Sequence, residues 1–346
     1  MKFDTSGLDP ELMVRHLAAA YGLPLTSPRF LPLGEDQNAF HWLAATADGS
    51  SYFVTAHRHA TSRIMDVDAA YAAAAALVTD CELREVVAPL PTVRGGFTST
   101  YQGWRLALFP FVPGTMAFDQ PLSENTLSQI ALLLARLHES RTCLRTPALG
   151  RERFASPFPA QLCDCLRAVE ALPADATVYQ RRLRDLLLRE QTDLVAYMDE
   201  LAQLEADVRA LPVEQVVTHG DLNLKNILVD ARGELYLVDW DGIALAPTER
   251  DLWTFSGEYL EPLLHAYAGA RPGLRLALPL FAYYRGCDTV LTIVDRVTRI
   301  LFHNRDPRED EHAWQELAPY LPLPRERLSR ELQEIESILK RVAGSP

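Results

Sequence analysis

Apolar and polar residues change their spacing along this chain, and the change divides it into two regions. Residues 10–21 place apolar side chains on one face at helical spacing. From residue 30 to about residue 111, the apolar runs become short and are bounded by turn residues, which is typical of strands. The expected strands are 39–44, 52–57, 86–93 and 98–109, with turns at 47–50 and 95–96. One Ala-rich helix, residues 65–79, is expected to cross this sheet.

Helical spacing dominates the second region, which begins after the breaker cluster Pro110–Gly114. The expected helices are 125–140, 178–211, 262–268, 280–303, 311–320 and 325–342. A β island interrupts them at 213–218, 227–229 and 235–238. The pattern therefore predicts an α+β fold in three parts. These are a β-rich N-terminal lobe (1–109), a hinge linker (110–114) and a larger, mostly helical C-terminal lobe (115–346).

Composition narrows the class of protein. The chain has 346 residues, with 34 basic and 46 acidic side chains and a net charge of −12. This balance disfavours nucleic acid as a partner, because phosphate backbones need a positive surface. The longest apolar run, 69–78, is too short to cross a bilayer, and the first residues do not resemble a signal peptide. We expect a cytoplasmic protein with no membrane contact, and nothing in the sequence implies a protein partner.

The five cysteines favour the same compartment. Their number is odd and their positions are scattered, which makes a poor disulfide framework and indicates a reducing environment. Cys163 and Cys165 have the spacing of half a metal site, but no second cysteine pair accompanies them. We therefore expect free thiols and no zinc.

The β island carries the residues with the most specific spacing. His219 and Asp221 are followed by Asn226, and Asp239 comes thirteen residues later at the end of an apolar strand. Phosphoryl transfer from a nucleotide needs a carboxylate to accept a hydroxyl proton and oxygen ligands to hold Mg²⁺ against the phosphates. A short loop between strands can present Asp221 and Asn226 to one site, where Asp239 can meet them.

These segments resemble a known family. His-Gly-Asp-x4-Asn from residue 219, followed by Val-Asp-Trp-Asp-Gly from residue 238, is similar to the catalytic and metal-binding segments of aminoglycoside phosphotransferases. Pro247–Leu252 resembles the segment that follows in that family. The small-lobe stretches are most similar to those of spectinomycin phosphotransferases; they are 33–40, 51–54, 87–90 and 109–112. The resemblance implies a bilobal protein-kinase-like fold.

The resemblance also implies roles, residue by residue. Asp221 would be the catalytic base, and Asn226 and Asp239 would bind Mg²⁺. His219 and Asp251 would support the catalytic loop. The implied nucleotide contacts are the turn with Gly34, Asp36 and Asn38, the strand position Thr55, and the backbone at Phe109 and Phe111.

Simpler interpretations stay open for several of these residues. Asp and Asn between strands often serve only in local turns, although the joint pattern of 221, 226 and 239 favours a site. Gly34 fits an ordinary hairpin turn equally well.

The sequence departs from the family at one position. The family places a lysine in the third strand, where it reaches the α- and β-phosphates and pairs with an acid on the next helix. Alignment puts Thr55 there, and the only lysines are 2, 225 and 340. His57 shares the face of Thr55 and is an uncertain candidate for approaching phosphate. Asp66 and Asp68 are candidate acids, although we favour them as a helix cap.

The predicted function is ATP-dependent transfer of the γ-phosphate to a hydroxyl of a small acceptor, with GTP as an open alternative donor. A cationic aminocyclitol or aminoglycoside such as spectinomycin fits the resemblance and the acidic charge. Choline, homoserine or a thio-sugar remain as other acceptors. Because of Thr55, a nucleotide-binding pseudokinase with weak or no transfer is the alternative from another class. Glu258, Asp288 and Asp295 could meet a cationic acceptor, but exposed helix faces explain them better.

Overall fold

The structure is a computed structural model that describes residues 6–34, 38–58, 65–145, 149–304 and 306–343. The chain forms two compact units, which we name by their content. The mixed unit comprises residues 1–152, 214–251 and 262–273, and the helical unit comprises 153–213, 252–261 and 274–346. The β island therefore belongs to the same unit as the N-terminal sheet. The division into lobes at 110–114 stays a prediction.

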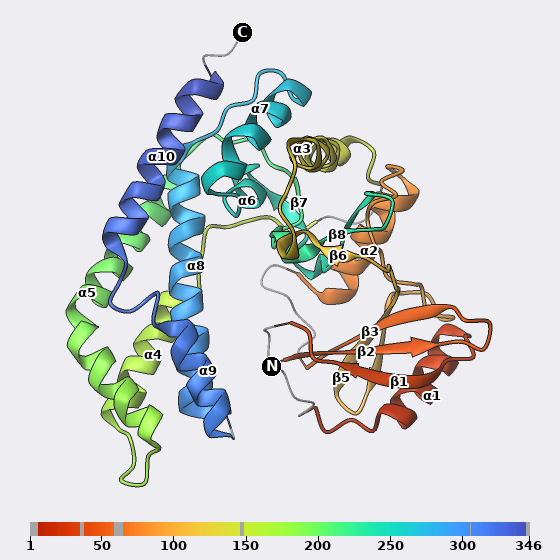
Figure 1. Ribbon diagram of the computed structural model, residues 1–346, viewed down its shortest axis with the longest axis horizontal. Coiled ribbons are helices and arrows are strands. Elements are labelled where there is room, and N and C mark those ends of the chain that lie inside the picture. The colour runs from red at the N-terminus through yellow and green to blue at the C-terminus, as the bar shows by residue number, and fades with distance from the viewer. Residues whose placement is uncertain (1–5, 35–37, 59–64, 146–148, 305, 344–346) are drawn as a thin grey trace. The chain divides into compact units, whose positions relative to one another are not determined.

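A five-stranded antiparallel sheet occupies the N-terminal part of the mixed unit (Figure 1). Its spatial order is β1-β2-β3-β5-β4. The strands are β1 (Thr26–Leu31), β2 (Ala39–Ala45), β3 (Ser51–His57), β4 (Thr98–Tyr101) and β5 (Trp104–Pro110). The predicted hairpin between β2 and β3 is confirmed, and Gly49 in its turn has a φ of +90°, which glycine adopts without strain.

Different helices cover the two faces of this sheet. Alternation in β2 sends Phe40, Trp42 and Ala44 into a buried cluster with α1 (Pro10–Tyr21). A second cluster includes Val67 and Tyr71 of α2 (Val67–Thr79). Their buried partners are Val87, Ala107 and Phe109, with Phe53 packed against them. The face that carries Phe53, and by alternation Thr55 and His57, is therefore the face toward α2.

Short strands complete the mixed unit. One antiparallel sheet contains β6 (Thr115–Met116), β8 (Ile227–Val229) and β9 (Leu235–Leu237), and another pairs β7 (Val216–Thr218) with β10 (Ala244–Ala246). The helix α3 (Glu124–Glu139) packs against β7. Ile227 pairs with Leu237. The residues just before β8 and just after β9 therefore meet at one end of the ladder.

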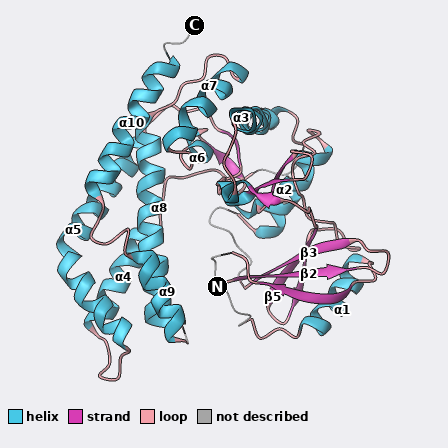
Figure 2. Cartoon of the chain, viewed as in Figure 1, coloured by secondary structure: helices cyan, strands magenta, loops and turns pink. Residues whose placement is uncertain are grey.

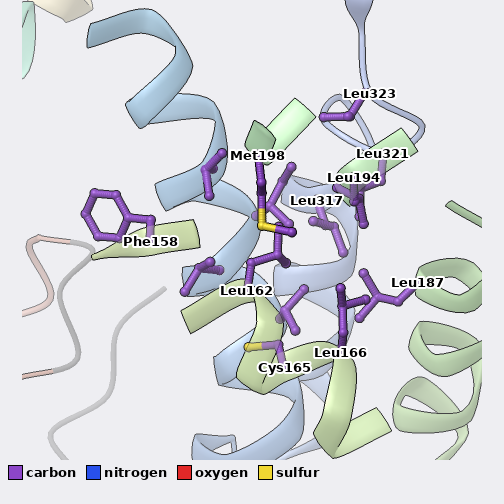
Figure 3. Close-up of a cluster of buried hydrophobic side chains, with 14 of the residues drawn as sticks. Phe158, Leu162, Cys165, Leu166, Leu187, Leu194, Met198, Leu317, Leu321 and Leu323 are labelled. Carbon is purple, nitrogen blue, oxygen red and sulfur yellow. The ribbon is translucent and has the colours of Figure 1, made fainter. Parts of the chain in front are cut away.

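The helical unit is built from long amphipathic helices (Figure 2). They are α4 (Phe158–Glu170), α5 (Val178–Arg209), α8 (Leu278–Thr298), α9 (Pro307–Leu317) and α10 (Arg325–Ala343). Leu162, Met198 and Leu317 illustrate its buried core (Figure 3). The helices α6 (Glu249–Leu252) and α7 (Leu260–Ala270) each have residues in both units. Within the described residues, no helix combines the length and the apolar character that a bilayer crossing requires.

The predicted order of a β-rich N-terminal part and a helical C-terminal part is confirmed, but two strand predictions are wrong. Residues 86–93 form no strand, apart from an isolated bridge between Val86 and Leu237. Pro89 and Pro91 lack the N–H groups that a strand ladder needs. The stretch 98–109 is two strands with a turn at 102–103 instead of one long strand. The sequence prediction also missed β1, β10 and α4.

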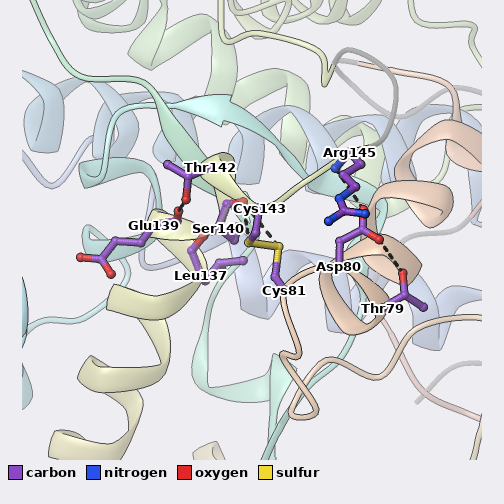
Figure 4. The surroundings of a disulfide bond; sticks show 9 residues. All are labelled: Thr79, Asp80, Cys81, Leu137, Glu139, Ser140, Thr142, Cys143 and Arg145. Carbon is purple, nitrogen blue, oxygen red and sulfur yellow. Dashed lines mark hydrogen bonds between the residues drawn. A yellow bond between two sulfur atoms is a disulfide. The ribbon is translucent and has the colours of Figure 1, made fainter.

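The expectation that no cysteines pair is also wrong. Cys81 and Cys143 form a disulfide with a Cα–Cα distance of 5.5 Å (Figure 4). Cys81 follows the end of α2 and Cys143 follows α3, so the bond joins two helix ends that are 62 residues apart in sequence. A scattered spacing does not exclude a pair, because the fold decides which thiols meet. The free cysteines among the described residues are 163, 165 and 287.

Candidate active site

The residues predicted to carry the chemistry begin directly after the buried strand β7. The 219–226 loop turns at Gly220 and ends in a short 3-10 helix, η3 (Leu224–Asn226). Asp221 is exposed, and its Oδ1 accepts a hydrogen bond from Nδ2 of Asn223 at 3.2 Å. Its Oδ2 accepts from Nδ2 of Asn226 at 3.1 Å. Two amide donors therefore orient a carboxylate that faces solvent.

Asp239 reaches the same place from β9. The N–H of Val238 donates to the carbonyl of Asn226 at 3.1 Å, which extends the β8–β9 pairing by one step. Asp239 follows with a φ of +68°, in the left-handed region that costs a non-glycine residue about 1–2 kcal/mol. Strain of this kind is commonly retained where a backbone must present a functional side chain. The fold thus brings residues 221, 226 and 239 to one end of the ladder.

The donor atoms of this trio suit a hard divalent cation. Asn226 uses Nδ2 to hold the carbonyl of Asp221 at 2.7 Å as well as its carboxylate, so its amide oxygen Oδ1 is turned the other way. An amide oxygen and a carboxylate are ligands that Mg²⁺ accepts, usually together with phosphate and water oxygens. No group of three or more His, Cys, Asp or Glu side chains that could hold a metal occurs within the described part of the chain.

His219 supports the loop from inside the protein. Its ring is fully buried, packs against Trp240 at 4.5 Å, and shares a 2.8 Å hydrogen bond between Nε2 and the carbonyl of Val238. Its Nδ1 lies 3.3 Å from the N–H of Asp221, which donates to it. Burial lowers the pKa of His219, against the opposite effect of nearby carboxylates. The ring thus links the 219–226 loop to the residue that follows β9.

Asp251 holds the backbone of the same loop. Its Oδ2 accepts the N–H of His219 at 2.8 Å, and its Oδ1 accepts the N–H of Gly220 at 2.8 Å. Burial would raise the pKa of Asp251, but the hydrogen bonds that it accepts from His138 and from the Gly220 N–H hold it below the ordinary value. A buried carboxylate with these donors fixes the path of the loop without meeting solvent.

His138, on α3, is a supporting residue that sequence reasoning missed. Its Nε2 is 3.1 Å from Oδ2 of Asp251, and its Nδ1 is 2.5 Å from the hydroxyl of Tyr267. Arg271 donates to that hydroxyl at 3.0 Å, so the tyrosine can donate to His138. The only sequence signal was a histidine on the buried face of an amphipathic helix, far from the motif.

The turn residues predicted to cover the phosphates are only partly described. Asp36 lies outside the described residues. Gly34 has a φ of +76°, as a tight turn requires, and the carbonyl of Asn38 accepts the N–H of Arg58 at 2.8 Å. These features fit both a phosphate turn and an ordinary hairpin turn.

The remaining predicted nucleotide contacts lie on β3 and at the end of β5. The Thr55 hydroxyl is 3.3 Å from Nδ1 of His41, and Phe109 is 7% exposed. The N–H of Phe111 donates to the carbonyl of Ser51 at 3.1 Å, so it does not point to a ligand. Because Pro110 has no N–H, backbone recognition at 110–111 has to use carbonyl groups.

A family model described as the phosphotransferase enzyme family, APH, matches residues 29–284. The chain belongs to this family. The match includes the five-stranded sheet from residue 29 onward, the 219–226 loop and Asp239. The predicted enzyme class, a small-molecule phosphotransferase, is confirmed at this level.

The chain is also similar to individual proteins in sequence and in structure. Protein StrN of Streptomyces griseus is 27% identical over 310 residues, which cover 86% of each chain. Spectinomycin phosphotransferase APH(9)-Ia, solved with ADP and spectinomycin, superposes with a TM-score of 0.72 at 18% identity, covering 91% of this chain and 95% of that one. A microcompartment-associated aminopropanol kinase gives a TM-score of 0.59 at 18% identity, with 96% and 100% covered. The structural likeness confirms the kinase-like fold.

The phosphotransferase has a glycine in its His-Gly-Asp motif for a steric reason. Gly220 has a φ of +90°, and a Cβ there would come within 2.3 Å of the Arg250 guanidinium. Arg250 uses that space to donate to the Thr218 hydroxyl at 2.9 Å and to the carbonyl of Gly242 at 3.0 Å. It thereby joins β7 to the segment after Asp239. Arg250 stands in the recognised Pro247–Leu252 segment, but its role could not be predicted from spacing.

Proposed function

We propose that this phosphotransferase transfers the γ-phosphate of ATP to a hydroxyl of a small molecule, and that an aminocyclitol such as spectinomycin is the first acceptor to test. One observation carries this proposal: Asn226 is hydrogen-bonded both to Asp221 and to Val238, the residue before Asp239. The group supplies a carboxylate and metal-binding oxygens at one end of one ladder.

Asp221 is proposed as the base. Its carboxylate accepts the proton of the acceptor hydroxyl while the oxygen forms a bond to the γ-phosphorus. The bond between that phosphorus and the bridging oxygen breaks, and ADP leaves with the electron pair. The amides of Asn223 and Asn226 hold both carboxylate oxygens in place before the acceptor arrives. A general base at this position contributes about 10²–10⁴-fold to the rate.

Asn226 Oδ1 and the Asp239 carboxylate are proposed to hold Mg²⁺. The ion would offset the negative charge of the phosphates during transfer. The backbone link between Asn226 and Val238 sets the spacing of the two ligands.

The absence of the family's lysine supports the alternative of a pseudokinase. Thr55 stands at its position and is hydrogen-bonded to His41, so no ammonium group is available there. Against this alternative, the base and both metal ligands are retained together, along with the buried groups that orient them. We therefore favour an active enzyme.

The preference for a cationic acceptor does not rest on Asp288 or Asp295. Asp288 pairs with Arg285 at 3.2 Å, and Asp295 pairs with Arg299 at 2.9 Å, within the helical unit. These two acids are half-buried and paired with arginines, whereas the simpler interpretation placed them on exposed helix faces. The proposal of an aminocyclitol therefore rests on the spectinomycin enzyme's likeness and on the net charge of −12. Choline, homoserine and thio-sugars remain acceptors for the same test.

The test is a phosphorylation screen of aminocyclitols, aminoglycosides and metabolite alcohols with ATP or GTP and Mg²⁺. Product is detected as an added phosphate by mass spectrometry, and ADP release is measured in parallel. Asp221→Asn serves as the inactive control. Phosphorylation of an acceptor by the wild-type protein alone supports the proposal. Equal product from both proteins would contradict the role of Asp221, and no product with any acceptor would favour the pseudokinase.

We also propose that the enzyme acts in the cytoplasm, because that compartment supplies ATP. The Cys81–Cys143 bond makes this testable, since cytosolic thiols are normally kept reduced. Thiol counting by mass spectrometry, on protein alkylated at the moment of cell lysis, should show all five cysteines modified. Three modified cysteines, counted with the protein denatured during alkylation because Cys165 is buried, would oppose a reducing compartment.

A further inference from the structure

A buried hydrogen bond joins β3 to α2, and the proposed function has not used it. His57, the last residue of β3, places Nε2 2.8 Å from the hydroxyl of Tyr71 on α2. His57 is 8% exposed and Tyr71 is 1% exposed. Water cannot easily replace either partner at such a site, so losing one group removes a buried hydrogen bond between β3 and α2. The bond therefore fixes the position of α2 relative to the sheet.

Tyr71 also adjoins two other parts of the nucleotide site. Its ring packs edge-on against Phe109, with centroids 5.3 Å apart. Its helix packs against η4 (Trp240–Gly242), which begins directly after Asp239. Burial raises the pKa of the Tyr71 hydroxyl, and the charges of Asp241 and Asp239 raise it further. A neutral hydroxyl thus sits where β3, β5 and the metal-binding segment come together.

The acids that the sequence offered for an ion pair with β3 are used elsewhere. Asp66 caps α2 by accepting the N–H of Asp68 at 2.9 Å, and it lies 4.0 Å from Arg105 of β5. Asp68 accepts the backbone N–H groups of Phe97 and Thr98 at 2.8 and 2.7 Å. Asp66 therefore caps α2, and Asp68 ties the first turn of α2 to the backbone of residues 97 and 98. The cap was favoured by the sequence, and the structure confirms it.

We propose that His57 and Tyr71 are positioning residues of the nucleotide and metal site, and that their hydrogen bond takes the place of the family's lysine–acid ion pair. The bond holds α2 on β3, and α2 holds the segment that carries Asp239. In the family the ion pair both fixes the helix and contacts phosphate. Here the first task passes to His57 and Tyr71, and the second is left to the metal. This inference rests on the proposed function only where it concerns turnover. Metal-dependent nucleotide binding can be measured without an acceptor and therefore tests the positioning role by itself.

The test compares Tyr71→Phe with the matched control Tyr21→Phe. Both changes remove one hydroxyl from a buried tyrosine of the mixed unit. Tyr21 is 7% exposed and donates to the carbonyl of Phe97 at 2.8 Å, from α1 on the other side of the sheet. The two variants should therefore lose similar thermal stability. They should differ only if the Tyr71 hydroxyl acts on the nucleotide and metal site.

The measurement is the affinity for ADP by calorimetry, with and without Mg²⁺. We expect Tyr71→Phe to reduce the Mg²⁺-dependent gain in ADP affinity by about tenfold, the effect of one lost positioning hydrogen bond. Affinity for ADP without metal should stay within about twofold of wild type, because only the metal-binding segment shifts. Tyr21→Phe should leave both affinities unchanged.

Replacing His57, the hydrogen-bond partner of Tyr71, gives a second test. His57→Gln keeps a polar group near Nε2 and should retain most of the Mg²⁺-dependent affinity, whereas His57→Leu should lose it. Combining His57→Leu with Tyr71→Phe should cost little more than either change alone, since both remove the same bond.

Two results would overturn the proposal. One is a Tyr71→Phe protein that matches Tyr21→Phe in both affinities, and the other is additive losses in the double variant. If His57→Leu does not fold, the comparison of the two tyrosine variants still decides. The Tyr71→Phe variant could lose the Mg²⁺-dependent gain while the wild-type protein phosphorylates no acceptor. That result would support this inference and contradict the proposed function.

Discussion

The loop side and the sheet side of the candidate site are built differently. On the loop side, Asp221 and its neighbours are fixed by buried hydrogen bonds through His219, Asp251 and His138. On the sheet side, the lysine of the family's charged pair is absent, and His57 and Tyr71 share a buried hydrogen bond instead. The chemistry of transfer needs atoms at fixed positions, whereas nucleotide binding can be distributed over several contacts. The loop side therefore depends on a few exact contacts, and the sheet side can use a different pair of residues for the same task.

The largest expected effect is on the loop side. Asp221→Asn should lower kcat by about 10²–10⁴-fold, because the amide cannot accept the hydroxyl proton. Its melting temperature should stay within a few degrees of wild type, since Asp221 is exposed. Asp230→Asn is the matched control, because it removes another carboxylate of the same segment from a turn after β8. A similar loss of kcat in both variants would contradict the assignment of Asp221 as the base, because Asp230 serves only in a turn.

The next effect concerns the fit between Gly220 and Arg250. Gly220→Ala places a Cβ against the guanidinium and forces alanine into a φ of +90°. The positive φ alone costs about 1–3 kcal/mol. Gly95→Ala is the control, because Gly95 has a φ of +79° with nothing within 4 Å of its Cβ position. Chemical denaturation should show a clearly larger loss for Gly220→Ala, and equal losses would mean that Arg250 moves away without cost.

The third prediction concerns the sheet side and restores the family's lysine at position 55. Thr55→Lys should tighten ADP binding by about tenfold if the alignment is right, because an ammonium group at this position can meet phosphate oxygens. Calorimetry at constant ionic strength measures it. A large loss of stability instead would show that the position is packed shut, since Thr55 is 5% exposed.

The smallest effect is the pH dependence of the loop support. Both His219 and Asp251 have pKa values below their ordinary values, so the unfolded chain takes up protons before the folded protein does. Stability should therefore be full above pH 6.5, the ordinary pKa of the histidine, and should fall as the pH drops below it. The expected slope is about 1 kcal/mol per pH unit. Denaturation midpoints at pH 7.5 and 5.5 that coincide would contradict this assignment.

The sequence predicted the loop side well because its groups lie close together. Asp221, Asn226 and Asp251 fall within one stretch with distinct spacing, so the motif itself places them. His138 is 113 residues from Asp251, and no local pattern connects them. The disulfide and the His57–Tyr71 bond were missed for the same reason, since each depends on where α2 lies. The strand predicted at 86–93 failed because Pro89 and Pro91 lack the N–H groups of a ladder, although Val86 and Val87 are buried.

The most direct test of the central claim is the Mg²⁺ dependence of ADP binding in Asp239→Asn. Asparagine tolerates the left-handed backbone of residue 239, so the fold should survive while the ligand charge is lost. The account predicts that calorimetry finds metal-free ADP binding retained and the gain from Mg²⁺ reduced at least about tenfold. An unchanged gain from Mg²⁺ in Asp239→Asn would contradict a metal site made by residues 226 and 239.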